Sequence, residues 1–219
     1  MRRREFARRA LLTSAAAGLV VPVLQSPAVA QSAAPKEGVD YYKLSSPAPV
    51  DTPAGKVEVV EFFWYNCPHC HKFEPQFEAW AKKAPAHVVV RRVPVAFRAD
   101  SVPQQRLYYT LEAMGKVEEL HGKVFNAVHG EKQRLNTQEE IVAWVTKQGV
   151  DKTKFLEFFN SFGVVGKAKR ATQLTEGYQV DGVPALGVAG RYFTSGPLAK
   201  SMERALMVVD HLVEVSRKG

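Results

Sequence analysis

The chain has 219 residues, with 30 basic and 22 acidic side chains and a formal net charge of +8. Five of the basic and one of the acidic side chains lie in the first 30 residues, so the rest of the chain carries a net charge of only +4. This balance is ordinary for a globular protein and excludes the strong basic excess that is typical of nucleic-acid-binding domains. The remaining 189 residues suit one domain, or one domain with an insertion.

The N-terminus has the pattern of a secretory signal peptide. An arginine-rich start precedes a mildly apolar run over residues 10–24, and residues 28–30, Ala-Val-Ala, offer a cleavage site. The apolar run is too short for a membrane span. Arg3 and Arg4 also resemble a twin-arginine signal, although an ordinary arginine-rich signal gives the same pattern. We therefore expect residues 1–30 to be a signal peptide and the protein to be exported.

The chain after the signal begins with a predicted strand, helix and strand. Residues 57–65 are β-branched and aromatic, as in a strand that is buried on both faces. Pro68 fits the first position of a helix, with Cys67 as its N-cap, and residues 88–95 predict a second strand.

A block of helices is expected over residues 101–178, where apolar residues recur at steps of three and four. Residues 137–140 form a capping box at the start of one of these helices. Four aromatic residues of the block are expected in the core between helices: Phe155, Phe158, Phe159 and Phe162. Beyond it, residues 185–188 and 191–194 predict a hairpin, and residues 198–217 predict one amphipathic helix.

Cys67 and Cys70 are the only cysteines, and they flank Pro68 and His69. A disulfide between them would close too short a loop to stabilise the fold much, so the pair indicates chemistry. Backbone N–H groups at the start of a helix stabilise a thiolate at Cys67, whereas Cys70 lies one turn further in. Cys67 is therefore expected to be the reactive thiol and Cys70 the resolving partner. His69 can add a donor or a positive charge to the thiolate.

Two other sites fit the same residues. The run from Cys67 to His71 also matches the C-x-x-C-H pattern of haem attachment, in which His71 would be an axial ligand. Cysteines and histidines are zinc ligands as well, but near-consecutive residues at a helix start cannot easily surround one ion. The preceding buried strand favours neither site. We therefore expect no metal and no cofactor, and an exposed position for His71.

Residues 60–74, VEFFWYNCPHCHKFE, resemble the active-site segment of the DsbA family. The resemblance implies an α/β thioredoxin fold with an inserted all-helical domain: residues 31–100 and 179–219 would form the thioredoxin-like part, and residues 101–178 the insertion. It also implies a periplasmic thiol oxidase that donates its disulfide to reduced, newly exported proteins; DsbA itself is known as a strong oxidant with a very low cysteine pKa. A quinone-linked membrane oxidase would reoxidise the pair, and the protein would be a monomer.

The resemblance extends to two positions outside this segment. Val183 and Pro184 precede the expected hairpin, where thioredoxin-like proteins place a cis-proline that faces the cysteines and a backbone that binds an extended substrate strand. In the family, an acidic residue at the position of Glu61 is buried beneath the cysteines and takes part in proton transfer. Its usual lysine partner is replaced here by Arg92, which can pair with Glu61 but cannot relay a proton. A trans proline and an outward, solvated Glu61 are the alternatives.

Other functions remain open at this point. They are an isomerase or reductase, a binding module that holds the pair reduced on a metal or haem, and a chaperone-like peptide binder. A dimeric isomerase would need a dimerisation module, for which this chain offers no spare segment. The sequence has neither a glycine-rich dinucleotide loop nor a Walker motif.

Overall fold

The computed structural model describes residues 34–218, so the expected signal peptide lies outside the described residues. A five-stranded mixed sheet has the strand order β1-β5-β4-β2-β3; β2 and β3 are parallel, and the other neighbours are antiparallel. In chain order the elements are β1 (Tyr42–Lys43), β2 (Val57–Phe63), α1 (Pro68–Lys83), β3 (Val88–Pro94), η1 (Ala99–Ser101), α2 (Val102–Ala113), α3 (Val117–His129), α4 (Gln138–Lys147), α5 (Lys152–Phe159), α6 (Phe162–Gly177), β4 (Ala185–Val188), β5 (Tyr192–Ser195), α7 (Gly196–Ala199) and α8 (Met202–Lys218). Over the range 34–218, none of the helices has the length and apolarity that a bilayer crossing needs.

Strand β2 divides the core into two parts. All seven of its residues are buried, which explains its nearly continuous apolar sequence. Val57 and Val59 pack with residues of α1 and α8, whereas Val60 and Phe62 face the core shared with the helical insertion. Because side chains alternate along a strand, Glu61 lies on the same face as Val59, under α1.

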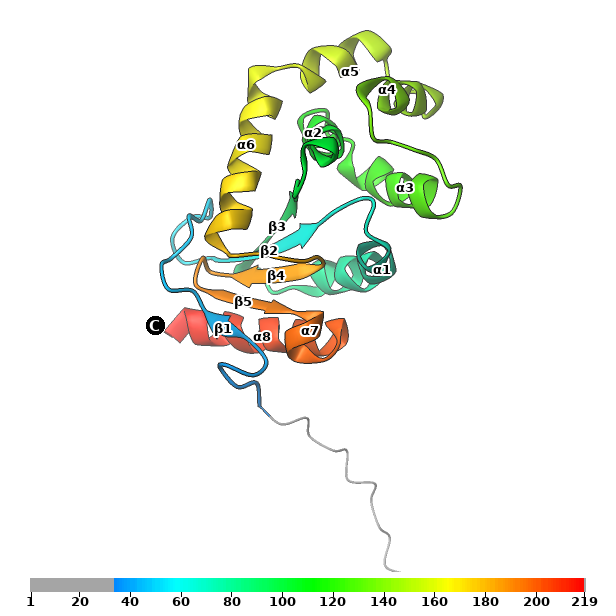
Figure 1. Cartoon of the computed structure of the whole chain (residues 1–219). Helices are drawn as coiled ribbons and strands as arrows, with labels where there is room; N and C mark the ends of the chain where they lie inside the picture. The colour runs from blue at the N-terminus through cyan, green and yellow to red at the C-terminus, as the bar shows by residue number, and fades with distance from the viewer. Residues whose placement is uncertain (1–33, 219) are drawn as a thin grey trace, which may run out of the picture. The chain divides into compact units, whose positions relative to one another are not determined.

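Helices α2–α6 leave the sheet after β3 and return to it at β4, which lies beside β2. Figure 1 shows α2–α5 together at the top of the view, with α6 running back from them to the sheet. The expected capping box is confirmed: Thr137 Oγ1 accepts from the Glu140 amide, and the Glu140 carboxylate accepts from the Thr137 amide, both at 3.2 Å. Gly115, at φ 66°, separates α2 from α3.

Three parts of the fold differ from the sequence predictions. The single helix expected over residues 198–217 is wrong, since Lys200 at φ 70° ends α7 before α8 begins. Phe158 and Phe162 are 38% and 93% exposed rather than in the core. Helix α5 buries one face only, and a new helix, α6, begins after Ser161. The four aromatic residues therefore do not lie on one buried helix face. Strand β1 was not predicted, because two residues are too few to show a period.

Replacing Gly187 by alanine is expected to destabilise the fold by about 1–3 kcal/mol, because the new methyl group has no room. Its Cβ would lie 2.3 Å from Cε1 of Tyr178, whose ring packs on Phe62 and whose hydroxyl accepts from the Gly190 amide. Urea unfolding measures the loss. Gly122→Ala is the control: nothing lies within 4 Å of its Cβ, and alanine in helix α3 should stabilise slightly. Equal effects of the two substitutions would contradict the steric argument.

Candidate functional site

The turn between β2 and α1 carries Cys67 and positions it as the N-cap of the helix. The Cys67 amide donates to Trp64 O at 3.0 Å, and Cys67 Sγ accepts from the Cys70 amide at 3.4 Å. Pro68, as expected, is the first helical residue. Both thiols are free in this structure, and Cys67 is 7% exposed whereas Cys70 is 1% exposed. Both cysteines are buried, and Cys67 is the more exposed of the two, as expected for the thiol that a substrate would reach first.

The two thiols have opposite acidities. Hydrogen bonds from the Cys70 side chain and from the backbone amides of Cys70 and His69, together with the positive charge available on His69, lower the pKa of Cys67 to about 6. Burial, followed by the hydrogen bond to Cys67, raises the pKa of the Cys70 thiol far above its usual value. At neutral pH the reduced pair thus holds one thiolate, at Cys67, and one thiol, at Cys70.

The loop before β4 lies against Cys67. The Val183–Pro184 peptide bond is cis, as the resemblance implies. The carbonyl oxygen of Val183 lies 3.3 Å from Cys67 Sγ, which donates to it when protonated. Two segments 116 residues apart in the chain therefore meet at the sulfur that would be attacked.

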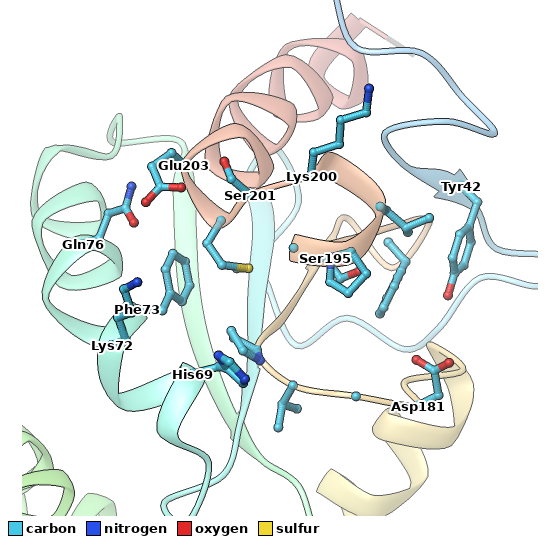
Figure 2. Close-up of a pocket in the computed structure, with 18 residues that line it drawn as sticks. Tyr42, His69, Lys72, Phe73, Gln76, Asp181, Ser195, Lys200, Ser201 and Glu203 are labelled. Atoms are coloured by element: carbon cyan, nitrogen blue, oxygen red, sulfur yellow. The ribbon is translucent and has the colours of Figure 1, made fainter. Parts of the chain in front are cut away.

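A groove of about 700 Å³ opens beside this contact. Figure 2 shows His69 and Lys72 on the α1 side, Asp181 at the Pro184 loop, and Lys200 and Glu203 at the junction of α7 and α8. The floor is largely apolar and includes Phe73, Phe193, Pro197, Leu198 and Met202. Such a surface, open to solvent and adjoining Cys67, has room for an extended peptide.

Beneath α1, a buried ion cluster surrounds Arg92. The parallel register of β2 and β3 pairs Glu61 with Arg92 directly, and Arg92 Nε donates to Glu61 Oε2 at 3.1 Å. Arg92 Nη2 also donates to Glu74 Oε1 at 2.7 Å and to Glu78 Oε2 at 2.8 Å. Glu61 is 1% exposed, so it is buried and not solvated. The sequence suggested the Glu61–Arg92 pair but missed Glu78.

Burial raises the pKa of Glu61 to about 8, and the neighbouring Glu74 adds to the rise while Arg92 opposes it. Glu61 therefore holds its proton through much of the neutral range. Its Oε1 atom has no hydrogen-bond partner among the described residues, and its charge is one of the influences that raise the pKa of Cys70. When it is ionised, the carboxyl group of Glu61 thus acts on Cys70 through its charge.

The prediction that His71 is an exposed helix residue is wrong. Its ring is half-buried and stacks on His129 of α3, with ring centroids 4.9 Å apart and planes 9° from parallel. Burial, and then the proximity of His129 and Lys132, lower the pKa of His71. Within the part of the chain that the structure describes, no three His, Cys, Asp or Glu side chains are grouped to hold a metal ion.

Comparisons with known proteins agree with this geometry. A family model described as the DSBA-like thioredoxin domain matches residues 58–206. The thiol:disulfide interchange protein DsbA of Bordetella parapertussis is 47% identical over 205 residues, which cover 93% of this chain and 95% of that protein. The protein of the same name from Burkholderia cepacia is 44% identical over 187 residues, covering 85% of this chain and 88% of that one.

Solved structures give the same result. The crystal structure of Pseudomonas aeruginosa DsbA matches with a TM-score of 0.79 and 42% identity, covering 83% of this chain and 94% of that chain. Oxidoreductase DsbA from Xylella fastidiosa matches with a TM-score of 0.78 and 29% identity, covering 84% and 99%. The thioredoxin fold with a helical insertion is therefore confirmed, and the chain belongs to the DSBA-like thioredoxin domain family.

Proposed function

We propose that this protein is a thiol:disulfide oxidoreductase that acts as an oxidase, donating a Cys67–Cys70 disulfide to reduced protein substrates. The observation that carries the proposal is the opposite acidity of the two thiols at the start of α1. A stabilised Cys67 thiolate is a good leaving group, so the disulfide that contains it is easily given away. The relatives named thiol:disulfide interchange protein support the same activity.

The transfer has two exchange steps. A substrate thiolate attacks Cys67 Sγ; a substrate–Cys67 disulfide forms, the Cys67–Cys70 bond breaks, and Cys70 leaves with the electron pair and takes up a proton. A second substrate thiolate then attacks the substrate sulfur of the mixed disulfide and releases Cys67 as a thiolate. The substrate loses two electrons and two protons, and the cysteine pair gains the two electrons. Because its pKa is near neutral, Glu61 is suited to supply the proton that Cys70 takes up.

Substrate binding is assigned to the loop and groove beside the thiol. An extended substrate chain would align with the backbone of Val183 and Pro184, as in strand addition, which brings its cysteine to Cys67. The flanking residues would rest on the apolar floor of the groove. Pro68 and His69 complete the site by starting the helix and by adding donor and charge near the thiolate.

The cellular setting belongs to the same proposal. Export through the signal at residues 1–30, by the twin-arginine or the general route, would bring the protein to the periplasm, where disulfides persist. Residues 101–178 would form the helical domain, and residues 31–100 and 179–219 the thioredoxin-like domain. A quinone-linked membrane oxidase would restore the disulfide of the monomeric protein, which needs no cofactor of its own.

The direction of exchange is tested by the equilibrium of the Cys67–Cys70 pair with glutathione. We expect the reduced pair to persist at ratios of reduced to oxidised glutathione that would leave an ordinary dithiol oxidised, because the thiolate stabilises the reduced form. Alkylation of free thiols followed by mass measurement gives the oxidised fraction. A couple as reducing as that of thioredoxin would contradict the proposal.

The same stabilisation predicts that the reduced protein melts at a higher temperature than the oxidised one at neutral pH. The pKa of Cys67 is lowered in the folded state, so its contribution is complete above the pKa of the unfolded thiol and is lost as pH falls through about 6. Calorimetry of both forms across this range measures the difference in melting temperature. A difference that grows toward acid pH would have the wrong sign.

A further inference from the structure

The two residues that precede Cys67 are anchored by the helical insertion. The Tyr65 hydroxyl and His121 Nδ1 are hydrogen-bonded at 2.8 Å. His129 Nε2 lies 2.8 Å from the carbonyl oxygen of Tyr65. A carbonyl oxygen can only accept, so His129 Nε2 carries the hydrogen and donates. Both histidines belong to α3, which thus fixes the side chain and the backbone of Tyr65.

Asn66, directly before the reactive cysteine, is held by two further amides. Gln104 Nε2 donates to Asn66 Oδ1 at 2.8 Å, and Asn66 Nδ2 donates to Asn136 Oδ1 at 2.9 Å. Gln104 Nε2 also reaches Asn136 Oδ1 at 3.2 Å, which closes a ring of three side chains that we call the amide cluster. Gln104 is 1% exposed. Burying a side-chain amide costs free energy unless the amide is hydrogen-bonded, so Gln104 needs these contacts in order to be buried.

The outer members of the amide cluster are themselves fixed. Gln104 lies in the first turn of α2. Asn136 precedes α4, and its amide donates to Glu140 Oε2 at 2.9 Å, the same carboxylate oxygen that accepts from Thr137 in the capping box. Through Gln104 and Asn136, Asn66 is therefore held between the N-terminal ends of α2 and α4.

We propose that Gln104 and Asn136 are positioning residues for thiol exchange, which hold Asn66 and thereby set the backbone that carries Cys67. The proposal rests on the proposed function, because it requires Cys67 to be the exchanging thiol. Cys67 is an N-cap, and its sulfur meets the amides of His69 and Cys70 only while its own backbone keeps the N-cap geometry. Releasing Asn66 would let the turn move and would weaken these hydrogen bonds to the thiolate.

The test compares two neighbouring glutamines of α2. Gln105 is also buried, but its Nε2 donates to Pro94 O at 2.9 Å, at the end of β3, and within residues 34–218 no hydrogen bond joins it to Asn66 or Asn136. Gln104→Leu and Gln105→Leu should both lower the melting temperature, since each removes the donor of a buried or half-buried acceptor. Only Gln104→Leu should raise the pKa of Cys67, from about 6 to about 7, which at neutral pH shifts the glutathione equilibrium about fivefold toward the disulfide. The thiolate absorbance of the reduced protein gives the pKa.

A second pair of variants covers the case in which Gln104→Leu fails to fold. Asn136→Ala lies in a half-exposed segment and should raise the pKa of Cys67 in the same direction; Asn126→Ala, whose side chain donates to Glu131 on the surface, should not. Unchanged pKa values in both Asn136→Ala and Gln104→Leu would overturn the positioning role. Failure of the proposed function would look different, because the unmodified protein would then not behave as an oxidant against glutathione.

Discussion

Replacing Cys67 by serine is expected to abolish disulfide transfer, whereas replacing Cys70 by serine should trap the substrate. Without the Cys67 sulfur there is no disulfide to attack, and we expect the rate of substrate oxidation to fall by roughly 10⁴-fold or more, as for other nucleophile deletions. In Cys70→Ser, Cys67 keeps its partial exposure of 7% and the backbone hydrogen bonds that lower its pKa, but no internal thiol can displace a bound partner. Oxidation of a reduced two-cysteine peptide measures the first effect.

The trapped species measures the second effect. Mixed with a single-cysteine peptide whose thiol carries an activated disulfide, Cys70→Ser should accumulate a peptide–Cys67 disulfide that appears on a non-reducing gel, because neither partner then holds a second thiol. Cys67→Ser should give none. Cys67→Ser also serves as the control for binding, because the groove beside His69 is intact. A chaperone-like peptide binder would keep its whole activity in this variant. Accumulation of the mixed disulfide at Cys70 in Cys67→Ser would reverse the assigned order of the two cysteines.

The cysteine pair that we propose as reactive could be singled out from the sequence because the features that mark it are local. A thiol before a proline at a helix start meets the N-cap amides whatever the rest of the fold does, so Cys67 and Cys70 differ already in the primary structure. The position of Glu61 was harder to predict. Strand periodicity places Glu61 on the opposite face of the sheet from Val60, but it does not say which face α1 covers. Only the packing of α1 on the face of Val59 shows that Glu61 is buried.

The contacts made by the insertion could not be predicted. Gln104, His129 and Asn136 lie 38 to 70 residues from their partners in the turn, and nothing in their own segments marks them as neighbours of Cys67. Periodicity predicts that a helix has a buried face, but not what that face meets. The exposed Phe162 illustrates the same limit, because an apolar residue at a helix boundary can be either buried or exposed.

Replacing Arg92 by methionine is expected to destabilise the protein by about 3–5 kcal/mol near pH 9, the usual cost of leaving buried charges without their partner. The guanidinium is the shared partner of Glu61, Glu74 and Glu78 and lies over the Phe77 ring. Methionine removes its charge but leaves an unbranched apolar side chain in its place. Urea unfolding measures the loss. Arg98→Met is the control: its pair with Asp100 is more than 60% exposed on both sides and should contribute less than about 1 kcal/mol.

The pH dependence of Arg92→Met identifies the carboxyl group responsible. Burial holds the folded pKa of Glu61 at about 8, and loss of Arg92 raises it further. Below pH 8 the carboxyl group is therefore protonated in both folded proteins and adds nothing to their difference in stability, whereas above pH 8 it ionises in wild type and not in the variant, so the penalty grows there. In a Glu61→Gln background, the penalty of Arg92→Met should be smaller than in wild type near pH 9 and unchanged near pH 6. The same penalty in both backgrounds at both pH values would mean that the cost of losing Arg92 does not lie in the charge of Glu61.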